Sequence, residues 1–552
     1  MLKNLNKKLL AILLLSLGVK VFISCYGFLF QIFFVDDAFY YFKIARNITS
    51  GLGITYDGIQ HTTGFQPLFL ILIIPFFLLG KNSIILPLHL VAVFLSFLSL
   101  GIGFFLYKIS KTVVDEWYAL FIVAIWSLSP IVVDKELNGM ETGLNLFLIA
   151  ATTYYYVSNI VNRLSDLQLK RILFLGIMIA LVILSRLDGL IFLGIIVIHL
   201  SYHIIKEFGS MGWFTKLVKS VLPLIGLVLI FVVPWLVFNY KVSGSVIPTS
   251  GQAVRYISLN YGFDFFNFRF GVNQPSFSPH DIPMQYYLEN IFFSFMKLLR
   301  HLPYTSYVAR VFYDILRASE GHILLAKGLT RILSSIVMLA LFSILWKLSP
   351  RSNRAWNILF FYSIFLISAY CFYAFGQWFY HRYYFTVAFM GTIWGGRVLF
   401  SIDSKLKKRL TVRRVFKMLI VIIFAVLYLL QWRQVFSQLH RNQSLNLYRM
   451  VKVVEWKIPK GAIIGCLQSG ILGYYSNRKV INLDGVVNQE ALIAMKGNRL
   501  GEYVAREGIT YIMDWPYVLN TLFFTHLGDC ESIKEITPIH KRFFHIYKIN
   551  YN

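Results

Sequence analysis

Charged residues are scarce in this chain of 552 residues: they make up only 14% of it, whereas 57% of the residues are hydrophobic. A soluble globular protein carries roughly 25% charged residues, because water has to solvate its surface. The shortage of charge therefore excludes a soluble protein. The surplus of apolar side chains indicates an integral membrane protein that crosses the bilayer many times.

Acidic residues are fewer than basic residues: the chain has 26 Asp and Glu and 53 Lys and Arg, which gives a formal net charge of +27. Nucleic-acid-binding proteins show a similar excess, but their basic residues form one patch or stripe. Here the basic residues fall in short runs between apolar segments. This is the pattern of cytoplasmic loops in membrane proteins, so we expect the lipid bilayer as a partner and no nucleic acid.

Cysteine is also rare, and its four positions exclude a disulfide scaffold and any CxxC or Cys/His zinc spacing. Cys25 and Cys371 lie in apolar runs, where a thiol behaves as a small buried side chain. Cys466 and Cys530 share the polar C-terminal region. A disulfide between these two stays open if that region faces an oxidising compartment.

A membrane-spanning helix needs roughly 20 mostly apolar residues. Candidate spans lie near residues 9–34, 84–107, 117–133, 142–160, 172–185, 189–205, 220–239, 329–347, 356–375, 383–401 and 415–433. The first follows a basic N-terminus, but it is too long for a signal peptide and no small-residue cleavage site follows it, so we expect a retained helix. The apolar run 67–80 is short for a span, which favours an interfacial or re-entrant segment.

The distribution of basic residues predicts the topology of about eleven spans. With residues 67–80 left out and the N-terminus in the cytoplasm, every dense basic loop lies on the cytoplasmic side. Counting residues 67–80 as a span would instead export the basic loops from Lys108 to Lys219. The regions expected outside are residues 35–83, 134–141, 241–328 and everything after about 434.

The end of the chain differs in character from the rest. Residues 434–552 contain apolar runs of strand length separated by Gly and Asn turns, which predict a small soluble α/β domain. The expected fold is therefore an all-α polytopic membrane bundle over residues 1–433 with a C-terminal extracytoplasmic α/β domain.

Two adjacent carboxylates, Asp36 and Asp37, directly follow the first apolar run. A charge at the edge of the hydrocarbon region is costly, so such a pair indicates a functional site. Alternatively, either residue caps a helix over residues 38–47. The two interpretations are compatible, because a cap fixes one carboxylate and leaves its neighbour free. Further along the same loop, His61 and Gln66 flank a turn and are candidate hydrogen-bonding groups, although a lone surface His is more often a neutral interfacial residue.

Three further polar groups lie at predicted helix ends. Glu141 is squeezed between two apolar segments; it either faces Asp36 or simply favours the first turn of a helix. Arg382 follows His381 in an exported aromatic segment, where a guanidinium suits a phosphate, although an interfacial belt explains the aromatics. Arg186 and Asp188 offer an ion pair at a helix break, for which a structural role is the simpler explanation.

In their order and common sidedness, these segments resemble the GT-C superfamily of membrane glycosyltransferases. The resemblance is closest to bacterial members that carry motifs matching Asp36-Asp-Ala-Phe-Tyr, Gly64-Phe-Gln-Pro-Leu, Gly139-Met-Glu-Thr and Arg382-Tyr-Tyr, and Leu483-Asp-Gly-Val-Val-Asn resembles their tail domain. Phe385 departs from the proline that often follows Arg-Tyr-Tyr. The Trp-Trp-Asp motif of oligosaccharyltransferases is absent, which argues against en bloc transfer to asparagine.

The resemblance implies an inverting transfer of a sugar from a polyprenyl-phosphate donor to a hydroxyl of an envelope glycan, glycolipid or protein. The reaction would take place on the outer face of a bacterial inner membrane. It implies Asp36 as general base, with Asp37 orienting it or binding a sugar hydroxyl and Glu141 converging on the pair. A like charge and burial would raise the pKa of such a base.

The resemblance also implies that Arg382, helped by Lys43 or His381, neutralises the leaving phosphate. His61, Gln66, Arg186 and Asp188 are then candidate substrate-binding residues. In some members a divalent cation such as Mg²⁺ or Mn²⁺ takes the neutralising role. Asp36, Asp37 and Glu141 are the candidate ligands here, and the sequence leaves the metal open.

A transporter or flippase of lipid-linked sugars is the main alternative, because intramembrane charges also mark transport paths. Transporters usually show related halves and broken helices near the midplane. The sequence shows no half-repeat, and its acidic residues gather on one predicted face. The pattern favours the transferase.

Overall fold

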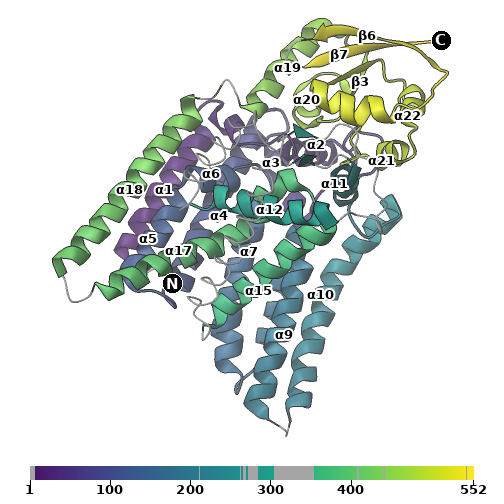
Figure 1. The fold of residues 1–552 in the computed structure, drawn as a ribbon. Helices are drawn as coiled ribbons and strands as arrows, with labels where there is room; N and C mark the ends of the chain where they lie inside the picture. The colour runs from purple at the N-terminus through teal and green to yellow at the C-terminus, as the bar shows by residue number, and fades with distance from the viewer. Residues whose placement is uncertain are drawn as a thin grey trace.

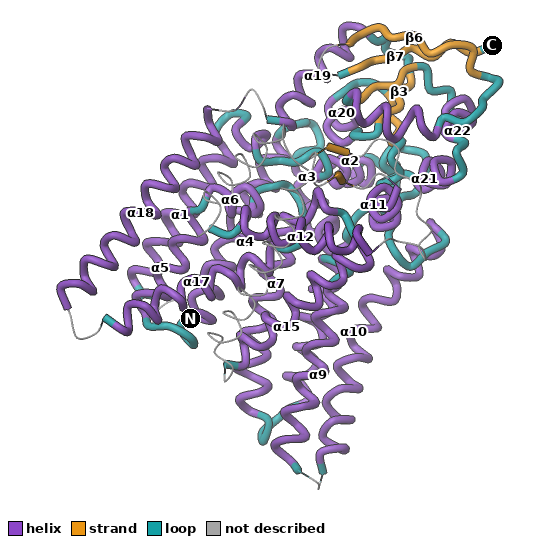
Figure 2. The backbone as a smooth tube through the Cα atoms, viewed as in Figure 1, coloured by secondary structure: helices purple, strands orange, loops and turns teal. Residues whose placement is uncertain are grey.

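The computed structural model describes residues 6–209, 212–260, 263–264, 269–270, 284–303, 353–406, 410–437, 439, 442–541 and 544–552. Most of them form a helical bundle, and the C-terminal sheet lies at one end of it, next to the short helix α2 (Ala38–Thr49) (Figure 1). The tube in Figure 2 shows the same division, with the strands of the C-terminal sheet gathered at one end of the helical bundle. The all-α bundle with a small sheet that the sequence predicts is confirmed.

Eight helices of the described chain are long and apolar enough to cross a membrane. They are α1 (Lys7–Cys25), α4 (Leu86–Ser110), α7 (Thr142–Tyr155, continued by irregular turns to Arg163), α9 (Gly189–Phe208), α10 (Trp213–Ser243), α15 (Arg354–Ala369, continued to Ala374), α17 (Phe385–Lys405) and α18 (Leu410–Ser437). The helices α5 (Glu116–Leu128) and α6 (Pro130–Glu136) pass the same test as a pair bent by 64°. The chain is therefore an integral membrane protein.

These helices account for most of the predicted spans. The stretch 172–185 is α8 (Leu169–Ser185), which has 17 residues, and 329–347 lies outside the described residues. The predicted first span is shorter than expected, because α1 ends at Cys25 and Gly27 takes a left-handed φ of +53° before a 3₁₀ turn, Leu29–Ile32. The run 67–80 forms the 13-residue helix α3 (Pro67–Leu79), which is short for a span.

The bend between α5 and α6 differs from the straight span and outer turn that the sequence predicts for residues 117–141. Pro130 has no backbone N–H and disfavours helical geometry at the preceding residue, and Ser129 is accordingly extended with ψ 124°. Helix α6 is held inside the bundle by an ion pair between Glu136 and Lys20 of α1 at 2.5 Å, whose side chains are 1% and 0% exposed. Trp126 donates to the second Glu136 oxygen at 3.0 Å.

The C-terminal region begins with α19 (Gln443–Lys457) and contains a five-stranded sheet in the order β4-β3-β5-β7-β6. Strands β3 (Ile463–Cys466), β4 (Lys479–Asn482) and β5 (Tyr511–Asp514) are parallel, whereas β6 (Ile533–Lys541) and β7 (His545–Tyr551) form an antiparallel hairpin added to β5. The connecting helices are α20 (Gly470–Tyr475), α21 (Gln489–Lys496), α22 (Leu500–Arg506) and α23 (Pro516–Val518).

Shorter elements complete the described part of the chain. They are α11 (Thr249–Asn260), the two-residue strands β1 (Phe263–Asp264) and β2 (Arg269–Phe270), α12 (Met284–His301) and α16 (Tyr380–Tyr383). The start of α19 is tied to the segment after α1, because Ser444 donates to the Phe34 carbonyl at 2.6 Å and Asn442 to the Ile32 carbonyl at 2.9 Å. The sheet-bearing region is thus fixed to the segment that follows α1.

Candidate active site

Helix α2 presents two polar faces, because residues four apart lie on the same side of a helix. Asp37 and Tyr41 point toward the ends of α7 and α16, while Asp36 and Tyr40 point toward the C-terminal sheet. The adjacent carboxylates that the sequence singles out therefore face different surroundings. Because they point in different directions, Asp36 and Asp37 contact different parts of the protein.

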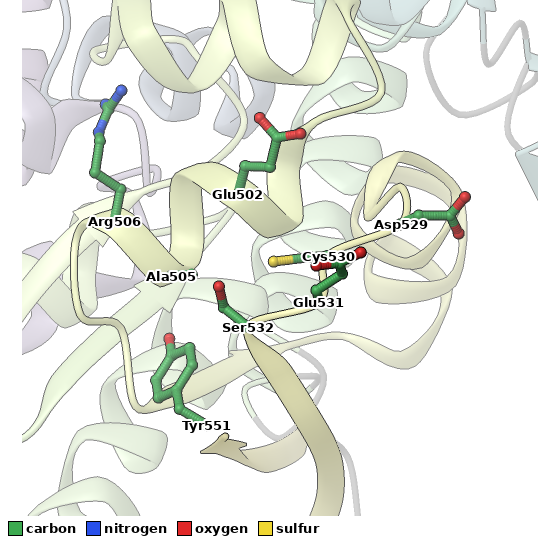
Figure 3. Close-up of a pocket in the computed structure, with 8 residues that line it drawn as sticks. All are labelled: Glu502, Ala505, Arg506, Asp529, Cys530, Glu531, Ser532 and Tyr551. Carbon is green, nitrogen blue, oxygen red and sulfur yellow. The ribbon is translucent and has the colours of Figure 1, made fainter.

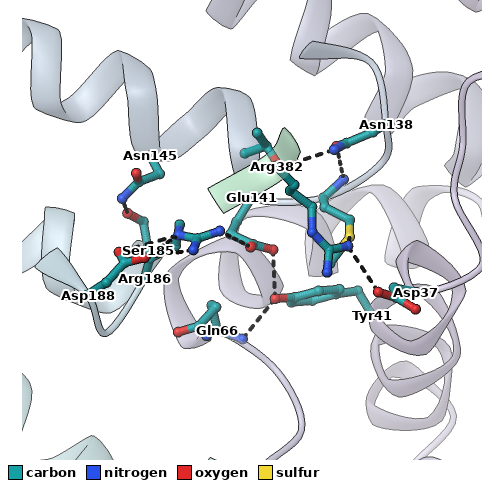
Figure 4. Close-up of polar contacts among 12 residues, drawn as sticks. Asp37, Tyr41, Gln66, Asn138, Glu141, Asn145, Ser185, Arg186, Asp188 and Arg382 are labelled. Carbon is teal, nitrogen blue, oxygen red and sulfur yellow. Dashed lines mark hydrogen bonds and ion pairs between the residues drawn. The ribbon is translucent and has the colours of Figure 1, made fainter. Parts of the chain in front are cut away.

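Asp37 forms an ion pair with Arg382 of α16, in which Arg382 Nη1 lies 3.0 Å from Asp37 Oδ2 (Figure 4). The guanidinium is buried, lies 4.4 Å from the ring centre of Phe379 and also contacts the Met140 sulfur. Its Nε is buried with no hydrogen-bond partner among the described residues. The Asp37 side chain keeps 27% of its exposure, so the pair remains open on the carboxylate side.

Glu141 belongs to a second polar group beside this pair. Tyr41 donates its hydroxyl hydrogen to Glu141 Oε2 at 2.9 Å, and the Gln66 backbone N–H donates to the Tyr41 oxygen at 3.0 Å. Arg186 Nη1 lies 3.4 Å from Glu141 Oε1. Glu141 therefore binds the Tyr41 face of α2 and does not converge on Asp36.

Arg186 and Asp188 form the predicted ion pair at the break between α8 and α9, with Nη2 and Oδ2 2.7 Å apart. Tyr370 joins it by donating to Asp188 Oδ2 at 2.7 Å. The ring centre of Tyr383 lies 4.9 Å from the Arg186 guanidinium and 5.7 Å from that of Arg382. Since cations are attracted to the faces of aromatic rings, Tyr383 links the two groups.

Asp36 is bound by the C-terminal region instead. Its Oδ1 accepts from the Ile471 N–H at 2.7 Å and its Oδ2 from the Gly470 N–H at 3.1 Å. Burial raises the pKa of Asp36 to about 7. The hydrogen bonds from the Ile471 and Gly470 N–H groups oppose this rise, and the Asp37 charge adds to it. Neither carboxylate caps α2 itself, since the N-cap residue Asp37 makes no side-chain capping bond.

The other predicted residues lie around this centre in different environments. Burial lowers the pKa of His381 well below its usual value, with Lys135 as the largest charge contribution, and its ring stacks on His301. Burial also lowers the pKa of Lys43, with Arg46 acting in the same direction. A neutral imidazole adds no positive charge to a phosphate site, so Arg382 is the cation best placed for that role.

His61 is exposed, and its Nδ1 lies 3.4 Å from the Ile54 carbonyl, within a turn that bridges Thr55 and His61. Gln66 is closer to the centre. Its backbone holds Tyr41, and its side-chain Oε1 is buried with no hydrogen-bond partner among the described residues. The structure thus brings Gln66, and not His61, to the Glu141 group.

A metal site does not assemble from the three predicted carboxylate ligands. Asp36 binds backbone N–H groups, Asp37 binds Arg382, and Glu141 binds Tyr41 and Arg186. Within the described residues, no group of three or more His, Cys, Asp or Glu side chains is placed to hold a metal ion. These three carboxylates therefore do not form a common ligand set.

The cysteines of the C-terminal region are both free. Cys466 is buried at the end of β3, 3.5 Å from Asp514 Oδ2. Cys530 lies in a surface pocket on the far side of the sheet region (Figure 3). The pocket is lined by Glu502, Ala505, Arg506, Asp529, Cys530, Glu531, Ser532 and Tyr551. The disulfide that the sequence left open is absent from this structure.

Three buried carboxyls near α2 predict that stability falls as the pH rises. Burial raises the pKa of Asp36 to about 7, of Asp484 to about 8 and of Asp514 to about 6, from 3.8 for an exposed aspartate. The folded protein keeps protons that the unfolded chain has released, so stability is lost as the pH rises through these values.

The temperature of the thermal unfolding midpoint in detergent should therefore decrease as the pH is raised from about 5 to about 8. Asp484→Asn does not titrate and should lessen this fall. A midpoint that rises over the same interval would contradict the assignment.

The helical bundle and the appended sheet region together have the fold of known GT-C glycosyltransferases. The chain superposes on the apo oligosaccharyltransferase of Archaeoglobus fulgidus with a TM-score of 0.51 and 12% identity, covering 99% of this chain and 74% of that one. The same enzyme tethered to an acceptor peptide containing the NVT sequon gives the same four values. ArnT of Cupriavidus metallidurans in the apo state gives 0.47 and 12%, over 98% of this chain and 97% of that one.

Two sequence comparisons add less. Residues 434–547 match a family model described as a domain of unknown function (DUF8728). No curated protein matches the sequence. The matched residues include the whole parallel part of the sheet.

Sequence reasoning missed Tyr41 and Tyr383, which hold the two polar groups together. A signal for Tyr41 exists in the sequence, since it follows Asp37 by four residues and so shares its helical face. Tyr383 directly follows Arg382 in the Arg382-Tyr-Tyr motif, but nothing in the sequence indicates its contact with Arg186.

Proposed function

We propose that the protein is a glycosyltransferase that moves a sugar from a polyprenyl-phosphate donor to an acceptor hydroxyl, with inversion at the anomeric carbon. The observation that carries the proposal is the Asp37–Arg382 pair, a partly exposed carboxylate 3.0 Å from a buried guanidinium at the ends of the bundle helices. A base and a phosphate-binding cation are the two groups that such a transfer requires. The GT-C fold supports the same reaction class.

Asp37, and not Asp36, is the base in this proposal. Both oxygens of Asp36 accept backbone N–H bonds from Gly470 and Ile471, and the residue is turned away from Arg382. Arg382 contacts one oxygen of Asp37 in the described contacts. When a donor phosphate draws Arg382 toward itself, Asp37 becomes available to an acceptor.

The step balances as a direct displacement. Asp37 takes the proton of the acceptor hydroxyl, the acceptor oxygen forms a bond to the anomeric carbon, and the bond from that carbon to the phosphate oxygen breaks. The lipid phosphate leaves with the electron pair beside Arg382, whose charge stabilises it. Glu141 binds the Tyr41 hydroxyl, and Arg186 contacts the Tyr383 ring. These contacts keep Asp37 and Arg382 in position relative to each other.

The positive-inside distribution of the basic loops supports a site on the extracytoplasmic face, with the N-terminus in the cytoplasm. The acceptor is then a glycan, glycolipid or protein of the envelope. Absence of the Trp-Trp-Asp motif from the sequence supports a hydroxyl acceptor over an asparagine amide.

An assay of the purified protein with alternative donors tests this function. Polyprenyl-phosphate sugars should be turned over and nucleotide sugars should not. Arg382→Ala should raise KM for the lipid donor at least about tenfold, because a charge-assisted phosphate contact is worth roughly 1.5–3 kcal/mol. The exposed Arg449→Ala in α19 is the matched control. Turnover of a nucleotide sugar without lipid would overturn the proposal.

A further inference from the structure

The C-terminal sheet faces α2 with the edge at which its parallel strands end. In sheets of this kind, ligands bind outside the carboxyl ends of the strands, at the point where the strand order reverses. Strand β3 lies between β4 and β5, so this point follows β3. The segment that leaves β3 there, Leu467–Ile471, is the one that contacts α2.

The crevice is filled by side chains of the bundle itself. Asp36 accepts from Gly470 and Ile471, and the Tyr40 hydroxyl lies 3.4 Å from the Leu467 carbonyl and 3.4 Å from Asn482 Nδ2. Asp514, at the end of β5, accepts from the N–H groups of Leu467 and Gln468 and so shapes the segment that receives α2.

The fit leaves no room for an added carbon atom. A Cβ on Gly470 would lie 2.1 Å from the Asp36 carbonyl oxygen, and a Cβ on Gly473 would lie 2.1 Å from the Tyr56 hydroxyl oxygen. That hydroxyl donates to the Ser469 carbonyl at 2.6 Å. Gly470 therefore packs directly on the Asp36 backbone and Gly473 on the Tyr56 side chain, and this close fit allows little movement of the turn that opens α2.

Asp36 and Asp37 are consecutive residues of the turn that opens α2, and Asp37 is the N-cap of the helix. A contact that fixes Asp36 consequently fixes the direction of Asp37. Asp36 contacts only the C-terminal region through its carboxylate in the described contacts, and Asp37 contacts Arg382.

We propose that the C-terminal domain is a positioning element for the reaction. It binds the Asp36 carboxylate in the crevice of its sheet and so aims Asp37 at Arg382. Asp36 is then a positioning residue. The carboxyl edge of the sheet binds a residue of the transmembrane module at the place where other parallel sheets bind a ligand. The inference rests on the proposed role of Asp37 as base.

Gly470→Ala in the full-length protein tests the inference, because it disturbs the contact without changing either carboxylate. We expect kcat for transfer to fall at least about tenfold while KM for the lipid donor changes less than about twofold. Hydrogen exchange of the amides in α2 and α16 should accelerate, because both ends of the Asp37–Arg382 pair lose their support. Gly461→Ala is the matched control, since a Cβ there meets nothing within 4 Å.

Asp36→Asn provides a second variant if Gly470→Ala does not fold. It retains one carbonyl oxygen as acceptor, and we again expect a loss in kcat with little change in KM. A loss beyond about a thousandfold with unchanged exchange of α2 would assign the base to Asp36 and overturn the inference.

The outcomes separate the positioning inference from the proposed function. Unchanged kcat in a Gly470→Ala protein whose α2 exchanges faster would overturn positioning and leave the function standing. A parental protein that transfers no sugar would refute the function, whereas unchanged exchange of α2 and α16 in Gly470→Ala would still refute the structural coupling.

Discussion

Asp37→Asn should slow sugar transfer by about two to four orders of magnitude, the usual contribution of a general base. Asparagine keeps the size of the side chain and an oxygen toward Arg382, but its amide cannot accept the acceptor's proton. The measurement is kcat of the purified variant with the lipid donor, beside its thermal unfolding in detergent.

Asp57→Asn is the matched control for this change. Asp57 lies in the segment between α2 and α3, where its Oδ1 accepts from the N–H groups of Ile59 and Gln60. It should transfer at close to the parental rate. A folded Asp37→Asn protein with near-parental kcat would remove Asp37 from the mechanism.

Lys20→Ala should destabilise the protein by about 3–5 kcal/mol, the usual cost of removing one partner of a buried ion pair. Glu136 is 1% exposed and would be left as an uncompensated charge inside the bundle. Because Glu136 ends α6, the segment from Asn138 to Glu141 should loosen as well. Unfolding of the purified variants by denaturant measures the effect.

Two further variants sharpen this test. Lys20→Met combined with Glu136→Leu removes both charges and should recover most of the stability. Lys111→Ala breaks a pair with Glu116 whose side chains are 44% and 53% exposed, and it should cost less than about 1 kcal/mol. An equal loss of unfolding free energy in Lys20→Ala and Lys111→Ala would contradict a larger contribution from the buried pair.

The helices of the bundle were predictable because each needs only its own apolar length. The pattern of residues 67–80, too short for a span, likewise matched the 13-residue helix α3. The bend at Ser129–Pro130 was overlooked because residues 117–133 are continuously apolar, and the partner that holds α6 in place, Lys20, is more than 100 residues away.

The candidate site also depends on contacts between segments that are far apart in the sequence. The sequence marked Asp36, Asp37, Glu141 and Arg382 as polar residues at membrane edges, and the structure brings the last three into neighbouring groups. Which of two adjacent carboxylates faces Arg382 depends on the rotation of α2, and that is set by Gly470 and Ile471. No local pattern reports a contact across 434 residues.

That separation also has a consequence in time. Chains are synthesised at about 5–20 residues per second, so Gly470 emerges roughly 20–90 s after Asp36, whose carboxylate it binds across 434 residues. During that interval the segment that contains Asp36 has been synthesised, while its partner segment does not yet exist. Until residue 470 has been synthesised, the nascent chain therefore lacks the contact that we propose positions Asp37.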